Sequence, residues 1–181
     1  MSEASPELHE VLRDAQRLGL LGARPIPGVI SHARAFVDAL QDVDGRVLDL
    51  GSGGGVPGLV IAHDRPDLQL TLVDRRTKRT DFLRRVVGRL GWVDRVDVVA
   101  LEAAALARRD PHAFAAVVAR GYGPPEITLA TALELVRPGG VIVVSEPPTG
   151  DRWSDLPAVT AGLVALDGRW PLVARFRVAS V

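Results

Sequence analysis

Between residues 46 and 145 the chain alternates short apolar runs with segments of helical composition, and this alternation restricts the possible folds more than any other feature. Strands are expected at residues 46–50, 69–73, 96–100, 115–119 and 141–145, with helices at 57–63, 77–90, 103–108 and 125–136 between them. Such alternation predicts an α/β fold with a mostly parallel sheet that is covered on both faces.

The two ends of the chain add to this pattern. Helices expected at residues 7–22 and 29–40 form an N-terminal appendage (1–44) to a core at 45–181. After the fifth strand we expect a short helix within 155–163, then strands at 163–166 and 172–178 around Asp167-Gly168-Arg169. Aspartate–glycine between apolar runs is a hairpin signal. The sequence therefore predicts one domain over residues 1–181, whose sheet ends in an antiparallel hairpin.

Composition excludes some classes of site. The chain has no cysteine, so a disulfide framework and a thiolate metal site are excluded. The four histidines, which are His9, His32, His63 and His112, lack the spacing of metal ligands, and we expect no metal. No apolar run approaches the length of a membrane span, and residues 1–10 do not resemble a signal peptide, so we expect a cytoplasmic protein and favour a monomer.

Charge argues against a surface that is basic throughout. The chain has 22 basic and 22 acidic residues, whereas dedicated nucleic-acid binders usually carry a basic footprint. Any such footprint must be local. Seven cations cluster in one stretch: Arg75, Arg76, Lys78, Arg79, Arg84, Arg85 and Arg89. They form either a solvated helix face or a contact for a phosphate backbone.

The first strand ends in a glycine turn that we interpret as a cofactor site. Glycines let the backbone approach a ligand closely, and the helix that follows offers unpaired N–H groups. The pattern Gly53-x-Gly55-x-x-Gly58 fits a dinucleotide site, which makes a nicotinamide or flavin enzyme one alternative. Asp49, two residues before Gly51, favours S-adenosyl-L-methionine instead, because Asp-x-Gly-x-Gly-x-Gly is typical of methyltransferases.

Two further strand ends carry candidate residues. Asp74 follows the second strand, 21 residues beyond Gly53, where a carboxylate can bind both ribose hydroxyls or cap the next helix. The segment 119–126 follows the fourth strand, and flanking glycines leave Tyr122 accessible for stacking on a planar substrate. Its prolines, Pro124 and Pro125, are equally compatible with a plain helix start. No nucleophile constellation accompanies these residues, and we expect no catalytic side chain.

Four segments carry a family resemblance: Val47-Leu-Asp-Leu-Gly-Ser-Gly-Gly-Gly-Val-Pro-Gly-Leu59, Arg65-Pro-Asp-Leu68, Leu72-Val-Asp74 and Lys78-Arg-x-x-Phe82-Leu83. They resemble the bacterial 16S ribosomal RNA guanine-N7 methyltransferases, also called the glucose-inhibited division protein B family (RsmG). The resemblance implies a class I, Rossmann-like methyltransferase fold of seven strands that ends in an antiparallel hairpin. It also implies that Gly51 and Val56 contact the cofactor and that Asp74 holds its ribose.

The expected site follows from the motifs and the resemblance together. The cofactor residues are Asp49, Gly51, Ser52, Gly53, Gly55, Val56, Asp74, Arg75, Leu101, Glu102 and Arg120. Among these, the resemblance implies that Leu101 and Glu102 frame the adenine and that Arg120 lies near the methionine end or the substrate. The expected substrate cleft contains Arg120, Tyr122, Ser145 and Glu146.

Three hypotheses about function stay open at this point. The first is an S-adenosylmethionine-dependent methyltransferase whose partner is ribosomal RNA or the small ribosomal subunit. The second is a methyltransferase that acts on a small molecule or a protein, which neutral net charge and Glu146 favour. The third is a cofactor-binding protein without catalysis.

Overall fold

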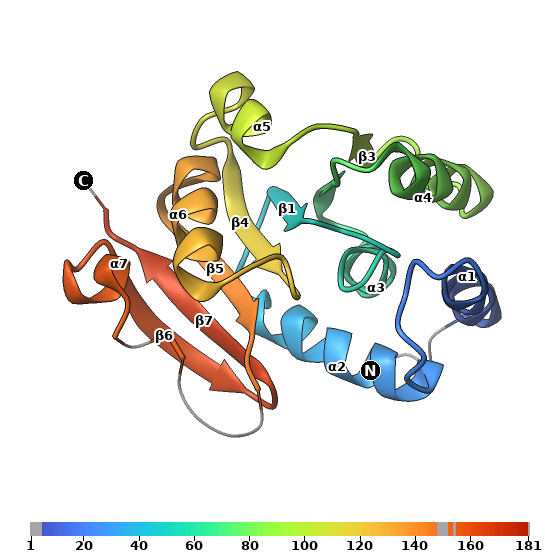
Figure 1. The fold of residues 1–181 in the computed structure, drawn as a ribbon, viewed down its shortest axis with the longest axis horizontal. Helices are drawn as coiled ribbons and strands as arrows, with labels where there is room; N and C mark the ends of the chain where they lie inside the picture. Colours follow the sequence, from blue (N-terminus) through green and yellow to red (C-terminus); the bar gives the residue numbers. More distant parts are fainter. Residues whose placement is uncertain (1–4, 148–151, 154, 181) are drawn as a thin grey trace.

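The computed structural model describes residues 5–147, 152–153 and 155–180. Its strands are β1 (Arg46–Leu50), β2 (Gln69–Val73), β3 (Val96–Val99), β4 (Phe114–Ala119), β5 (Val136–Ser145), β6 (Val164–Trp170) and β7 (Val173–Val178). Its helices are α1 (Pro6–Arg17), α2 (Ile26–Ala39), α3 (Gly58–Asp64), α4 (Thr77–Arg89), α5 (Ala103–Arg109), α6 (Pro125–Leu135) and α7 (Pro157–Thr160). Figure 1 shows these elements arranged around a single sheet.

The strands of the described ranges pair in the order β3-β2-β1-β4-β5-β7-β6. The pairs from β3 to β5 are parallel, whereas β7 runs antiparallel to both β5 and β6. This topology confirms the predicted mostly parallel sheet with a terminal hairpin. The chain order reverses between β1 and β4, so the carboxyl ends of these two strands flank the crevice where open α/β sheets bind ligands.

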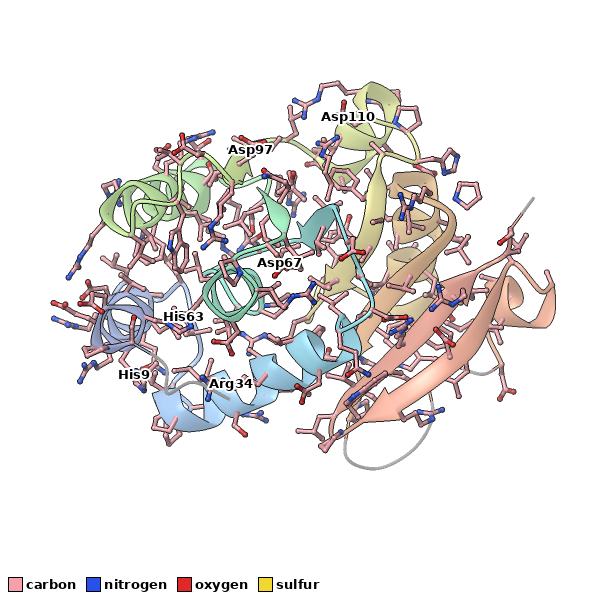
Figure 2. The ribbon with its side chains drawn as sticks, turned by 180° about the vertical axis from the view of Figure 1, so that it is seen from behind. His9, Arg34, His63, Asp67, Asp97 and Asp110 are labelled. Atoms are coloured by element: carbon pink, nitrogen blue, oxygen red, sulfur yellow. The ribbon has the colours of Figure 1, made fainter. Side chains whose placement is uncertain are left out.

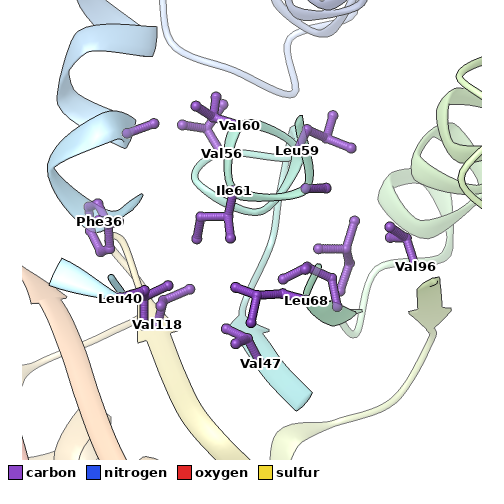
Figure 3. Close-up of a cluster of buried hydrophobic side chains, with 14 of the residues drawn as sticks. Phe36, Leu40, Val47, Val56, Leu59, Val60, Ile61, Leu68, Val96 and Val118 are labelled. Atoms are coloured by element: carbon purple, nitrogen blue, oxygen red, sulfur yellow. The ribbon is translucent and has the colours of Figure 1, made fainter. Parts of the chain in front are cut away.

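Helices cover both faces of the sheet, as the alternation predicts. One core cluster contains buried side chains of α1 to α4 together with Val47 and Val118, and Figure 3 shows part of it. The other contains side chains of α5 and α6 together with Leu48 and Val117. Because successive side chains of a strand point to opposite faces, each central strand contributes apolar residues to both clusters. This explains why β4 is buried along its whole length.

The N-terminal helices pack on the same face as α3. Helix α1 ends at Arg17, five residues before the predicted end at residue 22, because Gly19 adopts a φ of +68° that no helix contains. Helix α2 starts at residue 26, three residues earlier than predicted, since Pro27 is tolerated in the first turn of a helix. The connector between them lies on the glycine turn: a Cβ at Gly54 would be 2.7 Å from the Leu20 carbonyl oxygen.

The terminal hairpin turns at a different place from the one predicted. The dipeptide Asp167-Gly168 lies inside β6, at a register irregularity, and the two-residue loop is Pro171-Leu172. The Asp167 carboxylate forms ion pairs with Arg175 and Arg177 of β7, at 3.0 and 2.9 Å. These pairs stabilise an extended backbone at a dipeptide that commonly forms a turn. The prediction of a turn at 167–169 is therefore wrong, although the hairpin itself is confirmed.

Strand β5 also begins earlier than predicted. It starts at Val136, which was expected to end the preceding helix, and a bulge separates its first pairing from the regular ladder. Gly140 lies within that bulge, where a Cβ would be 2.8 Å from the Ala115 carbonyl oxygen. The Pro138-Gly139-Gly140 run, which reads as a loop, is thus accommodated as irregular strand.

A buried arginine joins the hairpin to the N-terminal helices. Only 5% of Arg175 is exposed, and its Nη1 donates to the Ala39 carbonyl oxygen over 2.9 Å. Its guanidinium also binds both carboxylate oxygens of Asp42, over 2.5 and 2.7 Å, which lowers the pKa of Asp42 to about 2. The end of α2 is thereby fixed to β7.

We expect Arg175→Ala to lower the free energy of unfolding by about 3 kcal/mol, because it leaves a buried carbonyl and a carboxylate without their donor. Urea unfolding at neutral pH measures this change. The matched control is Arg177→Ala in the same strand, whose side chain is 43% exposed and should cost under about 1 kcal/mol. Equal losses for the two variants would contradict the proposed role of Arg175.

Candidate cofactor site

A pocket of about 440 Å³ opens at the carboxyl ends of β1 to β4. Its wall consists of Leu50, Gly51, Val73, Asp74, Arg75, Arg76, Arg79, Leu101, Glu102, Ala103, Gly121, Tyr122, Gly123, Pro124 and Ile127. The volume is that of a small-molecule site, and the position is the topological switch point of the sheet. Six of the predicted site residues line it: Gly51, Asp74, Arg75, Leu101, Glu102 and Tyr122.

The glycine turn forms the floor between β1 and α3. Gly51, Gly53 and Gly55 have φ values of +73°, +56° and +93°, which side chains rarely tolerate. The Ser52 N–H donates to the Val73 carbonyl oxygen over 2.9 Å, which ties the turn to the end of β2. A Cβ at Gly55 would be 2.4 Å from Leu59 Cδ1, so this glycine is required for packing of the helix that follows.

Asp49 supports the turn from below and does not line the pocket. It is 1% exposed, and its Oδ2 accepts a hydrogen bond of 3.0 Å from the Gly58 N–H at the start of α3. Burial raises the pKa of Asp49 to about 7, although the Gly58 bond and the charge of Arg120 act in the opposite direction. A Cβ at Gly58 would be 2.5 Å from this carboxylate, which explains the glycine there.

Asp74 faces the pocket and organises its polar side. Its Oδ2 accepts from the Gly53 N–H over 3.1 Å and from Arg79 Nη1 over 3.1 Å. Its Oδ1 accepts from the Arg76 N–H over 2.9 Å, next to the start of α4. The carboxylate thus connects the glycine turn with α4, and it is positioned in the pocket wall where ligand hydroxyls can reach its remaining lone pairs.

Apolar side chains that follow β3 and β4 complete the pocket wall. Leu101 and Ile127 line it, and the Tyr122 ring lies over the glycine turn, since a Cβ at Gly51 would be 2.8 Å from Tyr122 Cδ2. Tyr122, predicted for the substrate cleft, therefore contributes to this pocket. At the rim, Arg75 Nη1 and Glu102 Oε1 are 3.3 Å apart, with both side chains mostly exposed.

The other predicted residues lie outside the pocket wall. Val56 is buried in the core beneath α3, and Gly53, Ser52 and Asp49 lie within or below the turn. Arg120 is half-buried at the end of β4, where desolvation lowers its pKa and the nearby charge of Asp49 raises it.

The structure does not bring Ser145 and Glu146 to the Tyr122 pocket. Ser145 pairs with Val173 at the end of β5. Glu146 forms an ion pair with Arg169 and lines a separate hollow of about 370 Å³ beside Trp170. The predicted substrate cleft is thus divided between two places on the carboxyl edge of the sheet.

Sequence reasoning missed several residues of the wall. Arg76 and Arg79 were assigned only to the cationic stretch, and Gly121, Gly123 and Ile127 were not considered as cofactor residues. The sequence could have predicted them, because residues that directly follow β2 and β4 come to the same edge of a parallel sheet, where ligands bind.

This arrangement suits a nucleoside. Asp74 offers hydrogen-bond acceptors for a ribose, and Leu101, Tyr122 and Ile127 offer apolar surface for a flat base. Within the described ranges, no three His, Asp or Glu side chains are grouped closely enough to hold a metal ion. No described helix is long and apolar enough to cross a membrane.

The raised pKa of Asp49 predicts a pH-dependent stability. An acid whose pKa is raised by folding stabilises the protein fully below its unfolded pKa of about 4, and this contribution is lost as pH rises through about 7. We expect the free energy of unfolding of the wild type, relative to Asp49→Asn, to fall by about 4 kcal/mol over that range. Asparagine keeps the acceptor for Gly58 but cannot ionise. Urea unfolding of both proteins at several pH values measures the difference between their free energies of unfolding. A difference that does not change with pH would contradict the raised pKa of Asp49.

Solved structures confirm the class I methyltransferase fold. A Corynebacterium glutamicum protein superimposes with a TM-score of 0.67 at 16% identity, covering 100% of this chain and 93% of its own. Cofactor-bound Rv0187 from MTB superimposes with a TM-score of 0.65 at 21% identity, covering 98% of this chain and 91% of its own. An S-adenosylmethionine-dependent methyltransferase from Geobacter sulfurreducens, in complex with S-adenosyl-L-homocysteine, superimposes with a TM-score of 0.55 at 28% identity. The match covers 66% of this chain and 51% of the Geobacter protein.

Sequence comparison adds the family. Relatives described as ribosomal RNA small subunit methyltransferase G include that of Nocardioides sp., 38% identical over 128 residues, which are 69% of this chain and 50% of the relative. That of Acidothermus cellulolyticus is 42% identical over 109 residues, 60% of this chain and 47% of the relative. The chain thus spans about half the length of these relatives. A model of the rRNA small subunit methyltransferase G family, GidB, matches residues 8–146. The chain therefore belongs to the rRNA small subunit methyltransferase G family.

Proposed function

We propose that this chain is an S-adenosyl-L-methionine-dependent methyltransferase that acts on ribosomal RNA of the small subunit. The observation that carries the proposal is the hydrogen bond from the Gly53 N–H of the glycine turn to Asp74, which lines the pocket. It places a carboxylate and a glycine-rich backbone together at the switch point of a class I fold. The family match supplies the acceptor class.

The residues of the pocket fit the cofactor. Asp74 would hold the ribose hydroxyls, with Leu101 and Tyr122 beside the adenine. The turn at Gly51 and Gly53 would allow close approach of the methionine part. Arg120 lies at the end of β4, near enough to Asp49 for their charges to interact. When bound, the cofactor supplies an activated methyl sulfonium. The chain then needs to hold donor and acceptor in line, since positioning alone can contribute much of the acceleration.

The turn by itself fits a dinucleotide as well as S-adenosylmethionine. Gly58, the third glycine of the dinucleotide pattern, lies against Asp49 and Leu72 and lets α3 pack on the sheet, which is also its role in dinucleotide folds. The family match and the S-adenosyl-L-homocysteine complex of the Geobacter sulfurreducens methyltransferase favour S-adenosylmethionine. We further propose that the helices of residues 1–44 and the sheet act as one domain, monomeric and cytoplasmic.

An acceptor other than RNA is the second candidate. The argument for it from Glu146 weakens in the structure, because Arg169 compensates the charge of that carboxylate. A catalytically inactive cofactor-binding protein is the third candidate. Both predict cofactor affinity without methylation of ribosomal RNA.

Calorimetry with S-adenosylhomocysteine tests the cofactor. We expect binding to the wild type, no binding of NADH, and a loss of about 1–3 kcal/mol in Asp74→Ala, because a charged acceptor of hydrogen bonds is removed. Asp81→Ala, an exposed carboxylate on the outside of α4, is the matched control and should bind as the wild type does. Unchanged affinity in Asp74→Ala would remove this residue from the site, and binding of NADH instead would overturn the cofactor assignment.

A methyl-transfer assay tests the acceptor. Small ribosomal subunits that lack the native methylation should incorporate labelled methyl groups from S-adenosylmethionine, whereas fully methylated subunits should not. Incorporation should fall in Asp74→Ala in parallel with cofactor affinity. Cofactor binding without any incorporation would favour the second or third candidate.

A further inference from the structure

The cationic stretch around α4 has a strong local excess of positive charge. Between residues 74 and 89 there are seven cations and two acids, although the whole chain has 22 of each. A local excess of this size is the footprint that a nucleic-acid partner requires. From sequence alone, a solvated helix face is the usual explanation of such a stretch.

The structure divides these cations into two sets. Four of them have carboxylate partners: Arg75 with Glu102 (3.3 Å), Arg79 with Asp74 (3.1 Å), Arg84 with Asp81 (3.0 Å) and Arg89 with Glu10 (2.6 Å). A bound polyanion would have to compete with these acids. The four arginines are therefore accounted for by contacts within the protein.

The remaining three cations, Arg76, Lys78 and Arg85, are exposed and form no hydrogen bond or ion pair through their side chains within the described part of the chain. Their charges are balanced only by mobile counterions. Binding a phosphate would release those counterions, which is the main source of free energy for protein–nucleic acid association. Unpaired cations are thus the ones that can contact a phosphate at least cost.

The positions of the three residues form a row that starts at the cofactor pocket. Arg76 lies in the pocket wall. Lys78 and Arg85 are seven residues apart in α4, which places them on one face of the helix, about 10 Å apart along its axis. Arg85 lines the groove between α4 and α1, together with Val11 and Leu18.

We propose that Arg76, Lys78 and Arg85 contact the phosphate backbone of RNA and direct the substrate strand toward the cofactor pocket. This inference rests on the proposed function for its partner, but it makes an independent statement about which surface binds. It also explains how a chain with zero net charge can bind RNA.

The test compares two double variants that remove the same charge from the same helix. Lys78→Gln/Arg85→Gln removes unpaired cations, and Arg84→Gln/Arg89→Gln, the matched control, removes paired ones. Fluorescence anisotropy with a short labelled single-stranded RNA gives affinity over a range of salt concentrations. The slope of log affinity against log salt concentration is negative, and each phosphate contact contributes about 0.7 to its magnitude on a single strand. We expect the first variant, which loses two contacts, to reduce this magnitude by about 1.4, and the control to keep the wild-type slope.

Each outcome decides the proposal separately from the cofactor assignment. S-adenosylhomocysteine affinity, measured on the same preparations, should be unchanged in both variants, which also shows that they fold. Equal slopes in all three proteins, or equal losses in the two variants, would overturn the phosphate row. So would a wild type that binds cofactor but no RNA, or one that binds phosphatidylserine vesicles in preference to RNA. Failure of cofactor binding itself would overturn the proposed function instead.

Discussion

The buried carboxylate of Asp49 is the constraint on which the cofactor turn depends. It accepts a hydrogen bond from the Gly58 N–H, and this bond fixes where α3 begins above the end of β1. Burying an ionisable group is unfavourable unless donors compensate it. Here the donor is the free N–H of a helix start, so the strand, the turn and the helix are held in a single geometry. A turn fixed in this way is preorganised for a ligand.

Asp74 extends this geometry to the neighbouring strand. Its bonds to the Gly53 N–H and to the start of α4 couple the turn to the cationic helix. On the other side, the backbone of the α1–α2 connector touches Gly54, so the N-terminal helices also rest on the turn. The cofactor turn thus has three supports, which are Asp49, Asp74 and the α1–α2 connector. Only the connector has no clear sequence signal.

The central sheet was predictable because its strands are buried on both faces and carry uninterrupted apolar runs. The hairpin was predicted with its turn at Asp167-Gly168, yet Arg175 and Arg177 hold that dipeptide in β6. A local turn preference was overridden by ion pairs across the sheet, which a sequence does not show. The expected substrate cleft stays a prediction: Tyr122 and Glu146 both follow strand ends, and in the structure they line different hollows.

The neutral net charge of the chain and a phosphate-rich partner are compatible once pairing is considered. Net charge counts Arg84 and Lys78 equally, whereas only the second is free of a carboxylate among the described residues. Exposed ion pairs contribute little to stability, so the acids beside Arg84 and Arg89 have a different consequence. They reduce the cationic stretch to a narrow row that begins at Arg76 in the pocket wall. A narrow row orients a strand, because contacts to phosphates fix the register and direction of a nucleic acid without reading its bases.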